Sequence, residues 1–340
     1  MLKLFAAALL IAAPLGAQHP ESTRAAPVEG ADFRVYDSRG KDASFAAVLA
    51  ALPQYEVALV GEQHDDMIGH GFQASLLAAA FQGLQPDRLV VLSMEMFERD
   101  VQYIVDEYLA DLISEEHFLS SARPWPDYEL RYRPLVEIAH AHGLPVVAAN
   151  APRRYVNRVS REGVESLADL PSSAKLFLPP LPYPGPSDEY RAQWDAVMAE
   201  AMVSMKAQMD SAAADSAAPE PETEPETEPE SDEEKTPPQH YMVSPNVIYS
   251  QALWDAAMGH GVTAALGAHP GSLVIHMAGS FHVARGTGIP ERIANYRPGT
   301  RVLSIVMEAV DDIHAWDNEK YRELGDFVIL TKKPAASEGN

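Results

Sequence analysis

Short, nearly continuous apolar segments alternate along this chain with longer segments of helical character. The apolar segments are rich in β-branched residues and span residues 55–60, 89–94, 144–149, 272–278, 301–307 and 326–330. Such segments are typical of strands that a parallel sheet buries on both faces. The intervening helical candidates span residues 69–82, 99–112, 131–142, 187–209 and 244–266. This alternation predicts an α/β fold with a largely parallel central sheet wrapped by helices.

Glycines and helical segments add detail to this prediction. Gly83 and Gly143 follow two of the helical candidates, at the position where glycine commonly ends a helix. The predicted domain is a single unit that covers residues 33–331. Part of its helical region, between residues 151 and 266, is expected to form a cap over one face of the sheet.

The first seventeen residues predict export. They combine Lys3, an apolar run and a small-residue cleavage pattern, which together indicate a signal peptide at residues 1–17. The run is shorter than the ~20 apolar residues that a membrane-spanning helix needs. No later segment reaches that length, and no cysteine follows the run to carry a lipid. We therefore expect a soluble periplasmic protein with no integral membrane segment after signal removal.

Low-complexity sequence interrupts the predicted domain at residues 211–238. The segment is rich in Pro and Glu and nearly free of large apolar side chains, which predicts a disordered acidic insertion. Residues 18–32 and 332–340 are expected to be a flexible lead-in and a flexible tail.

The net charge of −23 argues against nucleic acid as a partner, because its phosphates require a basic surface. The chain has no cysteine, which excludes disulfides and thiolate ligands.

Polar side chains follow four of the predicted strands at the point where each strand ends. In open parallel sheets, ligands bind in the crevice beyond the carboxyl ends of the strands. We therefore expect these side chains to line one ligand pocket. Their members, in chain order, are Glu62, His64, His70, Glu95, Asn150, Arg154, His282 and Arg285.

Four of these residues form a set suited to acid–base chemistry or to metal ligation: Glu62, His64, Glu95 and His282. The segments VALVGEQH and IHMAGSFH both place a histidine after an apolar strand and a Gly-x-x spacer, so each half of the chain contributes one histidine to the cleft. Taken singly, a histidine here is more commonly a helix cap or a core residue, and convergence at one edge favours a functional site. The remaining histidines of the domain interior are interpreted as structural: His140, His142, His260, His269 and His276.

Five segments that carry these residues resemble, in order, the signatures of the ChaN-like haem-binding uptake family of the Tiki and erythromycin-esterase-like superfamily. They are GEQHD, MEMFERD, PVVAANAPR, QALWDAAM and AGSFHVARGTGIPERI, and they lie within residues 55–297. The resemblance implies a role in haem or iron uptake at the bacterial envelope. It also implies that haem lies between the subunits of a homodimer and that a tyrosine binds its iron.

The tyrosine falls in none of the five segments, so the haem ligand stays open among Tyr128, Tyr132, Tyr155, Tyr183, Tyr190 and Tyr241. A haem-binding protein would hold the iron through a tyrosine or a histidine. It would pair the haem propionates with Arg153, Arg154 or Arg285.

Two other functions stay open at this point. The first is an envelope hydrolase of esters or peptides, as in related members of the superfamily. His64 or His282 would then act as general base, while Glu62 or Glu95 would orient that histidine or bind a divalent metal. The second, a purely structural envelope protein, leaves the convergence of polar residues unexplained.

Overall fold

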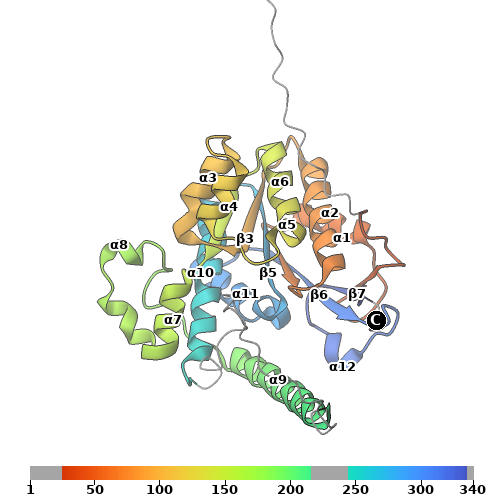
Figure 1. Cartoon of the computed structure of the whole chain (residues 1–340). Coiled ribbons are helices and arrows are strands. Elements are labelled where there is room, and N and C mark those ends of the chain that lie inside the picture. Colours follow the sequence, from red (N-terminus) through yellow and green to blue (C-terminus); the bar gives the residue numbers. More distant parts are fainter. Residues whose placement is uncertain (1–24, 216–243, 335–340) are drawn as a thin grey trace, which may run out of the picture.

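A seven-stranded sheet lies at the centre of the computed structural model, which describes residues 25–215 and 244–334 (Figure 1). The strands are β1 (Phe33–Asp37), β2 (Val57–Glu62), β3 (Val90–Glu98), β4 (Val146–Asn150), β5 (Leu273–Gly279), β6 (Val302–Val310) and β7 (Phe327–Lys332). Their order across the sheet is β1-β7-β6-β2-β5-β3-β4. Only β1 runs antiparallel to its neighbour, β7. The predicted α/β fold with a largely parallel sheet is confirmed.

Helices cover both faces of the sheet. One face packs against α1 (Phe45–Ala51), α2 (Met67–Leu84), α3 (Gln102–Leu109), α4 (Glu115–Ala122), α5 (Tyr128–Arg131) and α6 (Arg133–His142). The other packs against α10 (Val247–Ala268), α11 (Ile289–Tyr296) and the region of α12 (Asn318–Tyr321). Successive residues of β2 point to opposite faces, with Ala58 in the first core and Leu59 in the second.

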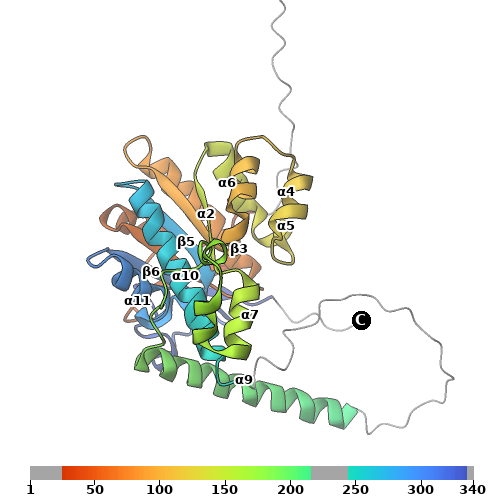
Figure 2. The ribbon, with the colours of Figure 1, turned by 90° about the vertical axis from the view of Figure 1, so that its left-hand side faces the viewer.

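Within the described residues, three α-helices lie between β4 and α10 in the chain: α7 (Arg153–Glu162), α8 (Ser172–Lys175) and α9 (Asp188–Asp215). Helix α7 packs on α10 through a third apolar cluster that includes Val156, Val159 and Leu253. Helix α10 itself packs directly on the sheet through Met258 and Val262, so the cap is made by the elements before it. Figure 2 shows the carboxyl-terminal part of α9 extending past the rest of the molecule.

Helix α9 continues to Asp215, past Ser211, where the predicted insertion begins. The rest of that insertion, the predicted signal peptide and the last residues of the tail lie outside the described residues. Within the part of the chain that the structure describes, no helix is both long enough and apolar enough to cross a membrane.

Two local predictions were tested by the helix ends. Gly143 ends α6 with a φ of 63°, as predicted. The prediction for Gly83 was wrong, because α2 continues through it to Leu84. Gln85 ends that helix in an extended conformation, which is the conformation favoured by a residue that precedes a proline.

Strand β1 was not predicted from the sequence, because its segment FRVYD alternates polar and apolar residues and gives no continuous apolar run.

Gly259 sets the close approach of α10 to α11, and its replacement by alanine is expected to destabilise the fold. A methyl group there would come within 2.5 Å of Arg292 Cβ and 3.3 Å of Ile293 N. Overpacking of this kind costs about 1–3 kcal/mol, measurable as a lower midpoint of urea unfolding. Gly267→Ala on the same helix is the matched control, because no atom lies within 4 Å of its added methyl group. Equal midpoints for the two variants would contradict the contact.

Candidate functional site

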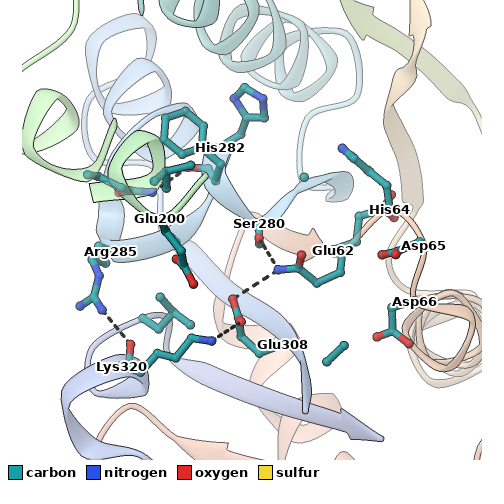
Figure 3. A pocket seen from close by; sticks show the side chains of 18 of the residues that line it. Glu62, His64, Asp65, Asp66, Glu200, Ser280, His282, Arg285, Glu308 and Lys320 are labelled. Atoms are coloured by element: carbon teal, nitrogen blue, oxygen red, sulfur yellow. Dashed lines mark hydrogen bonds and ion pairs between the residues drawn. The ribbon is translucent and has the colours of Figure 1, made fainter. Parts of the chain in front are cut away.

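The carboxyl ends of β2, β5 and β6 open into a cleft of about 990 Å³ (Figure 3). Helix α9 forms the facing wall with Trp194 and Val197, and Phe281 and Leu324 add further apolar surface. Three cationic side chains, Arg285, Lys320 and Lys333, also line the cleft, as do the acidic side chains Asp65, Asp66, Glu200 and Glu308. The cleft therefore lies where ligands of open parallel sheets bind, and it combines apolar walls with charge of both signs.

A row of polar contacts crosses the floor of the cleft. The Gln63 amide donates to Ser280 Oγ at 3.0 Å and to Glu308 Oε1 at 3.3 Å. Lys320 Nζ lies 3.5 Å from the other oxygen of Glu308. These interactions, drawn as dashed lines in Figure 3, join the ends of β2, β5 and β6 and fix the shape of the floor.

Strand pairing brings His64 and His282 together. Strands β2 and β5 are adjacent and parallel, with Glu62 opposite Gly279 in register. A methyl group at position 279 would lie 3.2 Å from His64 Nε2 and 3.7 Å from His282 Cδ2. Glycine thus leaves room for the two imidazole rings to approach the same point from neighbouring strands.

Glu62 is the centre of a buried hydrogen-bond network. Its side chain is 1% exposed. Oε1 accepts hydrogen bonds from His64 Nδ1 at 2.9 Å and from the Tyr132 hydroxyl at 2.8 Å. Oε2 accepts one from the Gln73 amide at 2.5 Å. A carboxylate that receives three donors is well compensated for its burial, and it holds the neighbouring side chains in place.

His70 lies behind Glu62, away from the cleft. Its Nε2 donates to the carbonyl of His64 at 3.0 Å. Its Nδ1 faces two acceptors, Gln73 Oε1 at 3.2 Å and Glu62 Oε2 at 3.6 Å. These contacts place the His70 ring directly behind the Glu62 carboxylate, where it is part of the same buried network.

His64 is the member of this network that reaches the cleft, with 46% of its side chain exposed. Since Nδ1 donates to Glu62, the tautomer is set and Nε2 is the nitrogen on the cleft side. Trp125 packs edge-on against the ring, with centroids 5.0 Å apart. Burial lowers the pKa of His64, but the hydrogen bond to Glu62 and the charges of Glu95 and Glu62 outweigh it and raise the pKa above its ordinary value.

His282 forms a second pair of imidazole and carboxylate. Its Nδ1 donates to Asp255 Oδ1 of α10 at 2.7 Å, and its Nε2 lies 3.9 Å from Glu95 Oε1. Burial lowers the pKa of His282, but Asp255 and Glu95 together raise it to about 9, so the ring is cationic at neutral pH. Glu95 Oε2 accepts the Gly279 N–H at 2.8 Å. The four residues Glu62, His64, Glu95 and His282 therefore meet at one edge.

The other expected pocket residues are placed differently. Arg285 lines the cleft, and its guanidinium donates to the carbonyls of Lys320 at 2.7 Å and Arg322 at 3.3 Å. Asn150 and Arg154 do not line it, because β4 lies at the sheet edge beyond β3. Asn150 Oδ1 accepts the N–H of the following residue, and Arg154 pairs with Asp100 at 2.6 Å.

None of the described tyrosines lines the cleft. Tyr128 is buried in the core beside Phe118, and the Tyr183 hydroxyl donates to the Tyr249 carbonyl at 2.8 Å from a buried position. Tyr132 and Tyr190 are also buried. Tyr155 is half-buried on α7, with the Arg154 guanidinium 4.6 Å from its ring centroid, and Tyr241 lies outside the described residues. A tyrosine ligand for haem stays a prediction.

Sequence reasoning missed the residues that support the four edge residues. Asp255 and Gln73 lie on helices and Tyr132 lies between two of them, so their contacts depend on how those helices pack. Asp255 did carry a signal, because it is an acid among the apolar residues of the segment QALWDAAM and is fully buried.

The sequence also allowed a metal site at this edge. No group of three or more His, Asp or Glu side chains in the described ranges is arranged to hold a metal ion.

Comparisons with known proteins match a family model and solved structures. The family model described as haem-binding uptake, Tiki superfamily, ChaN matches residues 48–293. The solved structure of ChaN from Campylobacter jejuni, reported with cofacial haem binding, has a TM-score of 0.58 at 15% identity and covers 90% of this chain and 99% of its own. The type III effector HopBA1 has a TM-score of 0.41 at 10% identity, with coverages of 84% and 92%.

One curated relative matches a shorter segment. It is the chloroplastic protein RETICULATA-RELATED 5 of Arabidopsis thaliana, which is 28% identical over 98 residues. The match spans 28% of this chain and 13% of that protein.

Proposed function

Because this chain belongs to the haem-binding uptake family of the Tiki superfamily that includes ChaN, we propose that it binds haem and takes part in haem or iron uptake. The matched residues include His64, His282 and the strands β2 and β5 that precede them. An envelope location is part of this proposal and rests on the expected signal peptide at residues 1–17. The alternative of an envelope hydrolase is not favoured by the family match.

The cleft offers what haem recognition requires. The macrocycle needs a concave, largely apolar surface, and Trp194, Val197 and Phe281 supply one. Its propionates need cations, and Arg285, Lys320 and Lys333 line the same cleft. The volume of about 990 Å³ lies within the ~300–1,000 Å³ typical of small-molecule sites. We therefore assign haem to this cleft.

We assign His64 as the iron ligand within the cleft. The observation that carries the proposal is that this partly exposed imidazole lines the cleft while Glu62 holds its other nitrogen. Its Nδ1 is held by Glu62, which leaves Nε2 to bind the iron. A carboxylate behind a ligating histidine fixes the ring orientation and increases its basicity. The tyrosine ligand implied by the family resemblance is the competing prediction, with Tyr155 the half-buried candidate.

Haem titration of the full-length protein at several pH values tests the proposal. We expect a saturable Soret shift, with an affinity that falls as the pH drops through the raised pKa of His64. The sign follows because a proton on Nε2 competes with iron. Below that pKa the competent fraction falls about tenfold per pH unit, and the apparent affinity falls with it. Size-exclusion chromatography of the same samples tests the predicted homodimer.

The absence of a saturable shift in folded protein would contradict haem binding. A saturable shift whose affinity does not change with pH would retain haem binding but contradict the assignment of His64.

A further inference from the structure

Among the α9 residues whose side chains the structure describes, three methionines lie on one face of the helix. Met198, Met202 and Met205 are spaced i, i+4 and i+7, which places their side chains on adjacent turns of the same helical face. We call this set the methionine face. Met202 is 67% exposed and Met205 is 45% exposed, while Met198 is partly buried.

This exposure contrasts with how the chain uses methionine elsewhere. The five methionines of the strands and of α10 are buried, with 0–1% exposure: Met94, Met96, Met258, Met277 and Met307. Those five fill the core, which is the ordinary role of this side chain. The methionine face fills no core, and the cleft is lined by other α9 residues, among them Trp194 and Val197. Neither packing nor the proposed haem cleft accounts for it.

We propose that the methionine face binds one soft monovalent metal ion, Cu(I), through its three thioethers. Thioether sulfur selects Cu(I), whereas borderline and hard ions prefer imidazole and oxygen. The chain has no cysteine, so methionine is its only source of sulfur ligands. The three rotatable bonds of each side chain allow sulfurs on adjacent turns to converge on one ion. Asp195, three residues before Met198, is exposed on the preceding turn and adds negative charge nearby.

Competition with the chromogenic chelator bicinchoninate, under anaerobic reducing conditions, tests the site on the full-length protein. The unaltered protein is expected to withdraw one Cu(I) per chain. The triple variant Met198→Leu, Met202→Leu, Met205→Leu keeps the apolar surface and the helix propensity but removes the three sulfurs of the methionine face, so it is expected to withdraw none.

Single substitutions measure how much each thioether contributes to the Cu(I) affinity. Loss of an outer-shell partner alone costs about 10–100-fold in metal affinity, so removal of one ligand in Met202→Leu is expected to cost at least that much. Val203→Leu is the matched control, because Val203 is 71% exposed on the same helix and carries no sulfur. Far-UV circular dichroism checks that every variant is folded.

Two results would overturn the proposal. One is failure of the unaltered protein to compete for Cu(I), and the other is a triple variant that binds Cu(I) as tightly as the unaltered protein. Haem titration of the triple variant separates this proposal from the haem assignment. Unchanged haem affinity is expected, whereas lost haem affinity would mean that the thioethers serve haem iron and would also overturn the copper site.

Discussion

Replacement of Glu62 by alanine is expected to lower the free energy of unfolding by about 3–5 kcal/mol. Three donors, from His64, Tyr132 and Gln73, would lose their acceptor at a buried position. His70, whose Nδ1 lies 3.6 Å from Glu62 Oε2, would also lose its buried carboxylate neighbour. Unsatisfied donors in the interior are among the most destabilising changes that one substitution can make. Urea unfolding followed by circular dichroism measures the loss.

Glu98→Ala is the matched control for this experiment. Glu98 is also an acid at the end of a strand, but its partner Arg123 is 52% exposed and the pair is on the surface. Such pairs contribute about 0–1 kcal/mol. Glu62→Gln should fall between the two, because it keeps the shape but removes the charge. If Glu62→Ala cost no more than Glu98→Ala, the network would not be the stabilising unit described above.

His64→Ala is expected to weaken haem binding by at least about 100-fold, which corresponds to ~3 kcal/mol of binding free energy. The ring supplies the iron ligand in the proposed complex and is partly exposed, so its removal should leave the fold intact. Loss of the ligand should also change the position of the Soret band. Titration of the purified variant, with unfolding monitored in parallel, separates lost ligation from lost structure.

Tyr155→Phe distinguishes the two assignments of the iron ligand. Under histidine ligation the variant should bind haem as the unaltered protein does. The reverse pattern, with haem lost in Tyr155→Phe and retained in His64→Ala, would refute the assignment of His64 and favour the tyrosine ligation that the family resemblance implies.

The sequence could predict which edge of the sheet carries the candidate site residues, because a parallel sheet aligns the carboxyl ends of its strands. This reasoning placed Glu62, His64, Glu95 and His282 together. In the structure Glu62, His64 and His282 line the cleft, whereas Glu95 does not line it and lies 3.9 Å from His282 Nε2. The same reasoning did not reveal which strands are neighbours. Residues after β4 were grouped with the others, yet β4 is an edge strand, so Asn150 and Arg154 lie away from the cleft.

The supporting side chains could not be predicted in the same way. Tyr132 reaches Glu62 from the junction of α5 and α6, and Asp255 reaches His282 from α10. These contacts depend on the rotation and depth of packed helices, which local patterns do not encode. The 67% exposure of Met202 is likewise not encoded locally, since a helical stripe of apolar residues ordinarily indicates a buried face.

The position of β2 at the centre of the sheet has a consequence for synthesis of the protein. Its two neighbours, β5 and β6, are encoded far downstream. At ~5–20 residues per second, about 200 residues between β2 and β5 correspond to ~10–40 s in which β2 has left the ribosome with neither edge paired. An apolar, unpaired strand is a natural target for chaperones during that interval. The pairing of β2 with β5 that brings His64 and His282 together is therefore among the last contacts that the nascent chain can make.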